Sequence, residues 1–336
     1  AYLNLTKQEE AIEYYERSLT IKKMLNDKKG VSRSLYGLGQ VFYQLKEYEQ
    51  SIIHFTECKD IEGELNGILN LSRCVYNLGL LHSIQKQYPK SIDYFKRAYD
   101  LKSQLQDQKG QADCLFQLSC IYYDQNQMQE ALNFIERSKT LEQPLNRPSK
   151  QRDLLYNEGL IKRNLTQIEE AKEAFEQVLE LAETYHDKVC HFGSLYHLGS
   201  IAADQGEYDQ AENWFRKYIE LGRKSEDKER EGRGWYHLGG HFVRTENLNK
   251  ADSCYTKALN CYEENECLNW EITPKTNYIT LYMAIGDLST KKEYFQEAKE
   301  YYEKALDQCD TNTHKELIKQ IKDKINELKS STTDMD

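Results

Sequence analysis

Apolar residues recur at steps of three and four through most of this 336-residue chain, with polar residues between them. The pattern is plainest in residues 191–221, where Leu195 and Leu198 precede Gly206, and Ala211 and Phe215 follow it. Such steps place side chains on one face of an α-helix, and a glycine between two such runs indicates a turn. This stretch therefore predicts a helical hairpin. A single hairpin cannot bury its own apolar face, so we expect a copy on each side of it.

The copies follow one another in a frame of forty residues. A small residue, which we call the marker residue, stands in the first helix of each unit: Gly39, Gly79, Ser119, Gly159, Gly199 and Gly239. Twelve positions later comes a second small residue: Ser51, Ser91, Ala131, Ala171, Ala211 or Ala251. Four positions further comes a bulky one: Phe55, Phe95, Ile135, Phe175, Phe215 or Tyr255. Small residues are needed where two helices cross closely, and bulky residues fill the space beside the crossing. The frame therefore predicts an all-α solenoid of antiparallel helix pairs.

The frame also divides the chain into parts. Residues 1–30 match only the second helix of a unit, so we expect a partial N-terminal repeat that is cut from a longer protein. Residues 31–264 form six forty-residue repeats. The first helices of these repeats are expected to begin near Val31, Leu71, Gln111, Gln151, His191 and Glu231.

The frame breaks once, because Gly286 lies 47 residues after Gly239. The seven extra residues predict an insert or long turn at 265–278, in which Trp270 either packs against the turn or forms an exposed contact. A seventh repeat is expected at 279–310, a C-terminal capping helix at 311–328 and a disordered tail at 329–336.

Helix starts carry their own signal. Four aspartates stand twelve positions before a marker residue: Asp27, Asp107, Asp187 and Asp227. An aspartate there accepts hydrogen bonds from free backbone amides and opposes the positive end of the helix dipole. Pro144 and Pro148 lie at the joint between the third and fourth repeats, yet the frame continues through it, so we expect a stiff turn and not a domain linker.

Composition agrees with an elongated helical stack. Only 39% of the residues are hydrophobic, the mean hydropathy is −0.82 and the chain has four prolines. The net charge of −10 is spread over interleaved acidic and basic residues, which is typical of solvated helix surface. No basic block is present to displace counterions from phosphates, so nucleic-acid binding is disfavoured.

Two further observations bear on the setting of the protein. No apolar run approaches the ~18 residues of a membrane span, and no signal-peptide pattern is present, so membrane insertion is not expected. The nine cysteines are odd in number and include no CxxC pair. They favour a reducing, intracellular and cytoplasmic setting.

The spacing of Leu-Gly, Tyr or Phe, Ala and Phe resembles that of tetratricopeptide repeats over nearly the whole chain. The usual unit of that superfamily has about 34 residues. Units of forty residues that begin with Asp-Lys resemble the LGN/Pins-like adaptors and, more loosely, kinesin light chain, with DKEREGRGWYHLG (227–239) as the nearest match. The resemblance implies a right-handed superhelix whose first helices line a concave groove.

One departure limits what the resemblance carries over. In LGN-like adaptors and in cochaperone carboxylate clamps, an asparagine follows the marker glycine and holds the ligand. Those positions here hold Gln40, Leu80, Cys120, Leu160, Ser200 and Gly240. Neither mode of peptide clamping is therefore expected. The arginine six positions before the marker, which in the LGN class meets acidic ligand residues, is present only at Arg33, Arg73 and Arg233.

An aromatic residue precedes each marker residue by three positions. This aromatic column comprises Tyr36, Tyr76, Phe116, Tyr156, Tyr196 and Tyr236. The rings either stack on adjacent repeats or form a continuous strip that grips a partner segment. Charge on the same wall alternates from Arg33 and Arg73 to Asp113 and Asp153 and then to Arg233, which fits a partner with acidic ends and a basic middle. The predicted partner-binding groove comprises Arg33, Tyr36, Gln40, Arg73, Tyr76, Phe116, Tyr156, Tyr196, Arg233 and Tyr236.

Catalytic and metal-binding signatures are weak. His237 and His241 are spaced to share a metal, but no acidic residue completes the motif, and the group of His186, Cys190 and His191 is no stronger. We find no phosphate loop, nucleophile elbow or paired-carboxylate signature. We therefore expect no cofactor, no metal and no intrinsic catalysis.

The sequence thus predicts a non-enzymatic adaptor that binds a protein or peptide segment in its groove. Two alternatives stay open. The chain is the substrate-recognition or regulatory arm of a larger enzyme, or it is a signalling receptor that senses a short peptide. The sequence does not predict an oligomeric state.

Overall fold

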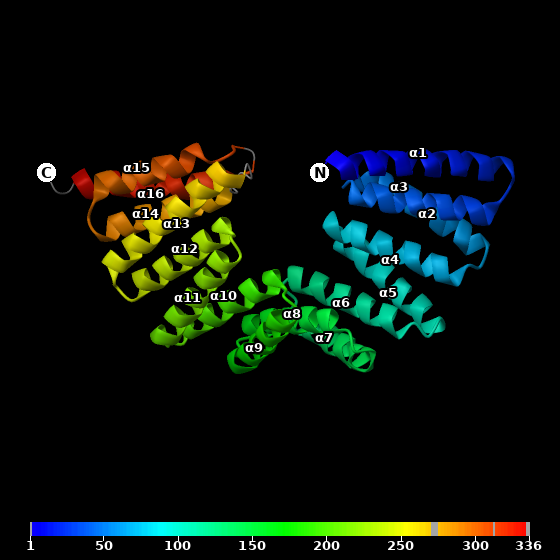
Figure 1. Ribbon diagram of the computed structural model, residues 1–336, viewed down its shortest axis with the longest axis horizontal. Helices are drawn as coiled ribbons and strands as arrows, with labels where there is room; N and C mark the ends of the chain where they lie inside the picture. Colours follow the sequence, from blue (N-terminus) through cyan, green and yellow to red (C-terminus); the bar gives the residue numbers. More distant parts are fainter. Residues whose placement is uncertain (1, 270–274, 312, 334–336) are drawn as a thin grey trace. The chain divides into compact units, whose positions relative to one another are not determined.

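The computed structural model describes residues 2–269, 275–311 and 313–333, and every regular element within these ranges is a helix (Figure 1). Consecutive helices pack against one another in residues 2–164 and again in residues 188–333. The predicted all-α class of stacked antiparallel helix pairs is confirmed. No helix in the described ranges is long and apolar enough to cross a membrane.

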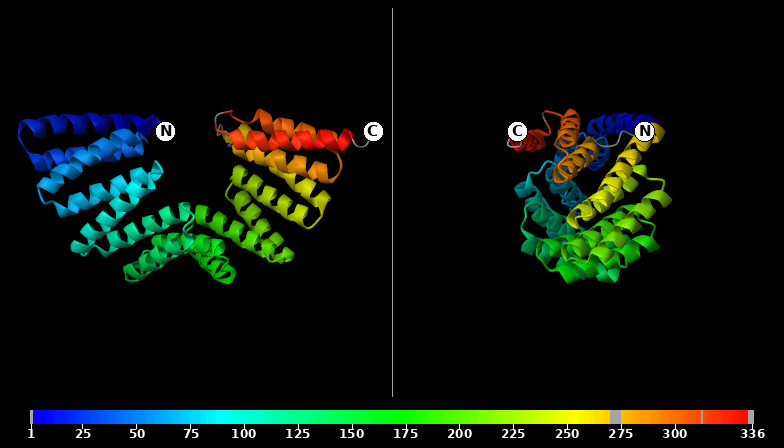
Figure 2. Two further views of the ribbon diagram at one scale, coloured as in Figure 1. Left: turned by 180° about the vertical axis from the view of Figure 1, so that it is seen from behind. Right: turned by 90° about the vertical axis from the view of Figure 1, so that its left-hand side faces the viewer.

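The chain divides into two compact units, residues 1–177 and 178–336. The first unit contains α1 (Tyr2–Met24), α2 (Lys28–Gln44), α3 (Tyr48–Glu64), α4 (Ile68–Ile84), α5 (Tyr88–Gln104), α6 (Gln108–Asp124), α7 (Met128–Glu142), the 3₁₀ helix η1 (Gln143–Leu145) and α8 (Pro148–Asn164). Helix α9 (Ile168–Thr184) spans the division. The second unit continues with α10 (Lys188–Asp204), α11 (Tyr208–Lys224), α12 (Lys228–Arg244), α13 (Leu248–Asn269), α14 (Lys275–Lys291), α15 (Phe295–Asp307) and α16 (Lys315–Thr333). Figure 2 shows from two further sides that the helices of each unit lie side by side in chain order.

The helices are joined by turns of one recurring kind. Between α1 and α13 a residue with positive φ lies in each turn, at intervals of twenty positions: Asn26, Lys46, Asn66, Lys86, Gln106, Asn126, Asn146, Thr166, His186, Gly206, Glu226 and Glu246. In the first turn Asn26 N donates to Lys23 O at 3.1 Å and Asp27 N donates to Lys22 O at 3.0 Å, which closes the helix with a left-handed residue. Because these turns are so short, the first helices begin three residues earlier than predicted, at Lys28 where Val31 was expected.

The predicted aspartate caps are confirmed. Asp27 Oδ1 accepts from Gly30 N at 2.9 Å, and Asp107 accepts in the same way from Gly110 N. Asp187 and Asp227 accept from the amides of Cys190 and Arg230. The bond from Gly30 N lowers the pKa of Asp27 below its usual value. Each cap therefore satisfies an amide that the helix itself leaves free.

The marker residues lie where the two helices of a pair cross. A Cβ added to Gly79 would lie 3.0 Å from the ring of Phe95, and the same holds at closer range for Gly199 and Phe215. The second small residues are fully buried, from Ser51 to Ala251. Glycine is therefore needed because an aromatic ring of the second helix occupies the space of its side chain.

Hydroxyl groups also link the crossing helices. Ser51 Oγ donates to Gly39 O, and Ser91 Oγ donates to Gly79 O, each at 2.7 Å. In the third repeat the direction is reversed, because Ser119 of the first helix donates to Ala131 O at 2.8 Å. The ring of that repeat is replaced by Ile135, which is smaller. Ser119, Ala131 and Ile135 thus form a different packing of the same crossing.

The predicted insert and tail need correction. Residues 265–269 belong to α13, which has 22 residues where most helices have 17, and 275–278 belong to α14. No glycine or proline precedes Pro274 in this segment, so nothing in the sequence ends the helix earlier. Helix α16 runs from Lys315 to Thr333 and not from 311 to 328, so residues 329–333, predicted to be disordered, are helical. Trp270 lies outside the described residues.

Candidate functional site

The predicted groove residues all lie on the first helices of the pairs. In the first unit these are α2, α4, α6 and α8, and in the second they are α10 and α12, followed by α14. First helices of neighbouring repeats touch each other, α4 with α6, α6 with α8, and α12 with α14. In each unit the first helices therefore form a wall on which the predicted residues recur at the same height.

The rings of the aromatic column are half-buried, and three of them, Tyr36, Tyr76 and Tyr156, pack edge to face on a phenylalanine of their own repeat. Tyr36 meets Phe55 edge to face at a centroid distance of 5.5 Å, and Tyr76 meets Phe95 at 5.4 Å. Burial raises the pKa of Tyr76. The column thus has a structural role in packing the hairpins, while part of each ring remains exposed.

The same rings also reach the next repeat. Asn77 Nδ2 donates to Tyr36 Oη at 3.4 Å, and the centroids of Tyr196 and His237 lie 4.5 Å apart. In both cases the partner stands 41 positions later, on the next first helix. Lys150 covers Phe116, with Nζ 3.6 Å from the ring centroid. The aromatic column therefore ties successive repeats together in each unit.

The three predicted arginines differ in their surroundings. Arg233 is paired with Glu229 at 2.7 Å. Arg33 and Arg73 are exposed, and neither guanidinium lies within ion-pair distance of an acidic side chain in the part of the chain that the structure describes. Two free cations beside Tyr36 and Tyr76 therefore mark the first unit as the stronger candidate for contacts with acidic groups.

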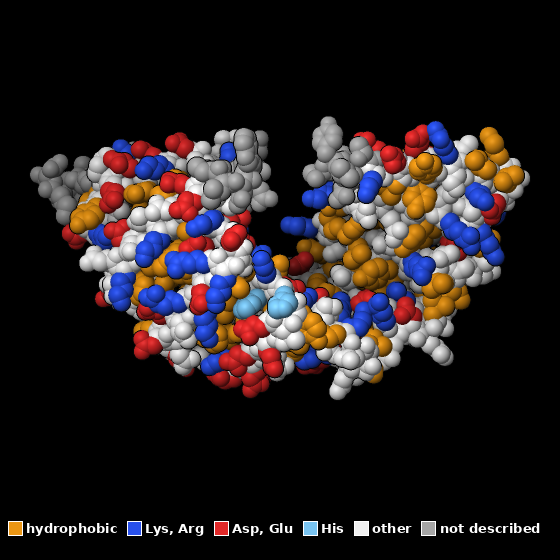
Figure 3. Space-filling view, viewed as in Figure 1, with side chains coloured by type: hydrophobic (Ala, Val, Ile, Leu, Met, Phe, Trp, Pro, Cys, Tyr) orange, Lys and Arg blue, Asp and Glu red, His pale blue; other side chains and the backbone are white. Residues whose placement is uncertain are grey.

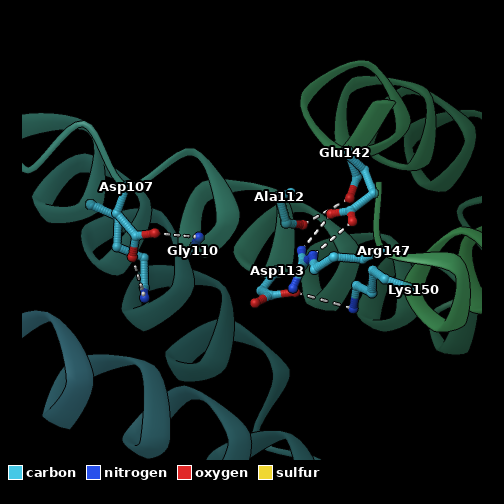
Figure 4. A network of polar contacts seen from close by, with 9 residues as sticks. Asp107, Gly110, Ala112, Asp113, Glu142, Arg147 and Lys150 are labelled. Carbon is cyan, nitrogen blue, oxygen red and sulfur yellow. Dashed lines mark hydrogen bonds and ion pairs between the residues drawn. The ribbon is translucent and has the colours of Figure 1, made fainter. Parts of the chain in front are cut away.

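The predicted acidic zone is neutralised by neighbouring cations. Figure 4 shows Arg147 between Glu142 and Asp113, with Lys150 reaching the same aspartate. Arg147 Nε lies 2.7 Å from Glu142 Oε1, and Asp113 Oδ1 lies 3.5 Å from Arg147 Nη2 and 3.4 Å from Lys150 Nζ. The hydrogen bonds with Glu142 raise the pKa of Arg147. Asp153 is likewise paired with Arg152, at 2.8 Å. This wall therefore offers less negative charge than the sequence indicates.

Surface chemistry differs between the two units. On the face drawn in Figure 3, hydrophobic side chains gather over α2 to α5 in the first unit, whereas Lys and Arg are frequent over α11 to α13 in the second. Ile53, Ile68, Leu69 and Ile84 are among the exposed aliphatic side chains of the first unit. The two units therefore differ in the side chains that they expose on this face.

The second unit contains a hollow that the sequence reasoning missed. Its volume is about 290 Å³, and its lining includes Tyr196, Ser200, Tyr236, Gly240 and His241. Ser200 and Gly240 occupy the position after the marker residue, which holds larger residues such as Leu80 and Leu160 in earlier repeats. Small residues at this position in two consecutive repeats were the sequence signal that could have indicated the hollow. We call this space the α10–α12 hollow.

Other chemistry is sparse. Among the described residues, no three His, Cys, Asp or Glu side chains are grouped so that they could hold a metal ion. His237 and His241 lie among aromatic rings, including Phe215. Cys58, Cys74, Cys114, Cys254 and Cys261 are buried with free thiols.

Comparison with known proteins gives two kinds of match. A family model described as "Tetratricopeptide repeat" matches residues 1–61, 71–141, 151–224 and 191–264, and a second model with the same description matches 279–311. These ranges include most of the chain. A search of curated proteins found no match.

Solved structures with low sequence identity share the fold. A tetratricopeptide repeat protein from Parabacteroides merdae is 17% identical, with a TM-score of 0.60 over 86% of this chain and 98% of that chain. A STAND signal-transduction ATPase from Pyrococcus horikoshii, which has a tetratricopeptide repeat sensor, is 15% identical, with a TM-score of 0.66 over 91% and 46%. The Rap conjugation gene regulator of plasmid pLS20, in complex with the Phr* peptide, is 16% identical, with a TM-score of 0.51 over 93% and 78%.

Proposed function

Because this chain belongs to the tetratricopeptide repeat family, as its spacing predicted, we propose that it is a non-enzymatic adaptor that binds a segment of a partner protein along its first helices. Repeats of this kind expose one continuous wall and leave function to the side chains on it. The predicted groove residues lie on that wall, half-buried or exposed. The proposed setting is the cytoplasm.

One observation carries the proposal. Arg33 and Arg73 are exposed next to Tyr36 and Tyr76, on the first helices α2 and α4, and no acidic side chain neutralises them in the described part of the chain. Half-exposed tyrosines beside unpaired arginines are the residue types that dominate protein interfaces. We infer that the partner segment places carboxylates against these arginines and apolar groups against the tyrosines.

The test starts from a partner identified by native affinity purification and mass spectrometry. Arg73→Glu should slow association and reduce its salt dependence, because it reverses a charge that attracts the partner. Lys96→Glu on the second helix α5 is the matched control, since Lys96 is also exposed and lies off the wall. Binding kinetics at two salt concentrations measure both variants.

The opposite pattern of binding would reject the hypothesis that the partner binds along the first helices. If Lys96→Glu weakened binding and Arg73→Glu did not, the partner would bind the second helices, and the tyrosines would be packing residues only. Tyr76→Ala and Tyr156→Ala should each weaken binding by more than about 1 kcal/mol if they are central contacts. Both rings also pack on a phenylalanine, so melting curves of the variants must accompany the binding data.

A second candidate role is the sensing of a short peptide, either alone or as the recognition arm of a larger enzyme. It is supported by the likeness to a regulator solved with a peptide and to an ATPase whose repeats are described as a sensor. A free peptide of a few residues that raises the melting temperature would favour this role over docking of a protein segment.

A further inference from the structure

The α10–α12 hollow lies beside a position that holds a serine and a glycine in two consecutive repeats and leucine in two earlier ones. The position after the marker residue holds Gln40, Leu80, Cys120 and Leu160 in the first unit, and then Ser200 and Gly240. A Cβ added to Gly240 would find only Tyr255 Oη within 4 Å, at 3.9 Å. Gly239, one position earlier, would place its Cβ 2.4 Å from the Tyr255 ring. Glycine at 239 is therefore needed for packing, whereas glycine at 240 leaves space open.

The walls of the hollow are aromatic. The rings of Tyr196 and His237 lie 4.5 Å apart, and those of Tyr236 and Tyr255 lie 6.1 Å apart. Phe215 also contributes to the lining. A lining of aromatic rings favours contact with another ring, edge to face or face to face. The volume of about 290 Å³ suits one large side chain and is small for a drug-sized molecule.

His241 adds a polar group to this lining. Its side chain is 4% exposed, and its Nδ1 has no hydrogen-bond partner. A buried polar atom without a partner is costly, and such atoms are rare in folded proteins. A neutral imidazole can donate a hydrogen bond through one nitrogen and accept one at the other. It can therefore pair with a hydroxyl group that acts as either acceptor or donor.

The hollow carries little charge. Arg244 at its edge is paired with Asp204, at 2.9 Å, and also donates to Ala203 O. Burial lowers the pKa of His241, and that of His237 to about 4, so both rings are neutral at pH 7. A carboxylate or phosphate buried here would therefore lack an unpaired cation as its partner. A neutral hydroxylated ring needs no charged partner when it is buried.

We propose that the α10–α12 hollow binds the side chain of a tyrosine in the partner segment, with the ring against Tyr196 and Tyr236 and the hydroxyl group paired with His241. The inference rests on the proposed function, since it assigns one side chain of the bound segment. It identifies the occupant by chemistry: a ring that matches the walls and one hydroxyl that meets the unpaired imidazole.

The test uses the full chain and two small probes, N-acetyl-L-tyrosinamide and N-acetyl-L-phenylalaninamide, followed by NMR of labelled histidine rings. We expect saturable binding of the tyrosine amide with a Kd on the order of a millimolar. The phenylalanine amide should bind about fivefold more weakly, which is the ratio that one neutral hydrogen bond contributes. His241→Phe should remove this preference, because it keeps a ring and deletes both nitrogens.

Gly240→Leu fills the hollow with the residue that Leu80 and Leu160 provide in other repeats, and should abolish probe binding. The fold should be preserved, because the added Cβ enters open space and leucine favours helix over glycine. Gly63→Leu is the matched control: Gly63 is also helical, its Cβ would meet nothing within 4 Å, and it lies on α3. This variant should bind the probes as the parent does.

Three results would overturn the inference: no saturable binding, equal binding by Gly240→Leu, or a preference for tyrosine that survives in His241→Phe. These results would not bear on the proposed function, because its test measures how Arg73→Glu in the first unit changes binding of the natural partner. Conversely, if Lys96→Glu weakened partner binding and Arg73→Glu did not, the proposed function would fail. Binding of the free tyrosine amide in the hollow would still be expected.

Discussion

Glu142 and Arg147 hold the same two places in their repeat that a lysine and an aspartate hold in others. Lys22 pairs with Asp27 at 3.3 Å and Lys102 pairs with Asp107 at 3.4 Å, each across the turn before a first helix. At 142 and 147 the polarity is reversed, and Glu142 is only 1% exposed. The chain therefore accepts a pair of opposite charges in either order at these two places, while three other repeats have no such pair there.

This exchange can be tested by swapping the charges. Arg147→Asp alone should lower the free energy of unfolding by about 3–5 kcal/mol, because it leaves a buried carboxylate facing another one. Adding Glu142→Lys restores the charge order seen at 102 and 107, and Arg147→Asp itself supplies the aspartate cap that α8 lacks. We expect the double variant to recover most of the loss, measured by denaturant unfolding of both single variants and the double. Additive losses would show that the two positions are not coupled.

At the scale of the elements, the turns set the geometry of the stack. Most helices have 17 residues, and the left-handed residue between them recurs every twenty positions. Only Gly206 among these residues is a glycine, and Thr166 is β-branched with a φ of 61°. Left-handed backbone costs an ordinary residue about 1–2 kcal/mol, so the turns are held in place by the packing of the helices they join.

Thr166→Gly should therefore stabilise the chain. Relief of the left-handed strain should stabilise the folded chain by more than the added entropy of glycine stabilises the unfolded chain. The free energy of unfolding should therefore rise by about 0.5–1 kcal/mol. Gly206→Thr is the reciprocal control and should destabilise by a similar amount. Denaturation midpoints of both variants provide the measurement, and a fall for Thr166→Gly would show that the threonine makes a contact worth more than its strain.

The same elements show what the sequence could and could not predict. The forty-residue frame and the aspartate caps were predictable because they depend on residue identity at fixed spacing. The turns were not, since residues such as Lys46 and Glu226 give no local sign of a left-handed backbone. The extra residues after Asn260 were assigned to a turn, although nothing in them ends α13 before Asn269.

The candidate site was predicted only in part. The sequence placed the aromatic column on one helix face, and the structure places it there. It could not indicate that Arg147 and Lys150 neutralise Asp113, because those residues meet only through the turn after α7. The α10–α12 hollow was missed because Ser200 and Gly240 were interpreted only as positions that lack the ligand-binding asparagine. Their small side-chain volume was not considered.

At the scale of the whole molecule, buried histidines link stability to pH. Burial is the largest cause that lowers the pKa of His54, His82, His191, His237 and His241. Histidine in an unfolded chain titrates near pH ~6.5. Below that pH the unfolded chain binds protons that the folded chain excludes, so the free energy of unfolding falls as the pH falls.

His237 should contribute the largest single share of this dependence. Its pKa is lowered to about 4, so its contribution is complete above pH ~6.5 and is lost progressively towards pH 4. The full shift corresponds to about 3 kcal/mol, and the partly exposed ring reduces this to about 1–3 kcal/mol. Urea midpoints near pH 7.5 and pH 5 should differ clearly, and His237→Gln should flatten the difference. An unchanged pH dependence in that variant would contradict the assignment.

The reversed hydroxyl bond at Ser119 bears on how such repeats diverge. Compared with the majority form, which has glycine, alanine and phenylalanine at the three positions, two positions differ: Ser119 stands in place of glycine and Ile135 in place of phenylalanine. Introducing the serine first would drive its Cβ into a ring about as close as 3.0 Å in the neighbouring repeat, whereas shrinking the ring first opens room for it. The order of substitution is therefore constrained, and a lineage can reach this packing only through a loosely filled intermediate. Neighbouring repeats in the stack supply the stability that such an intermediate lacks. A long solenoid can thus explore sequence one repeat at a time along paths that would unfold an isolated hairpin.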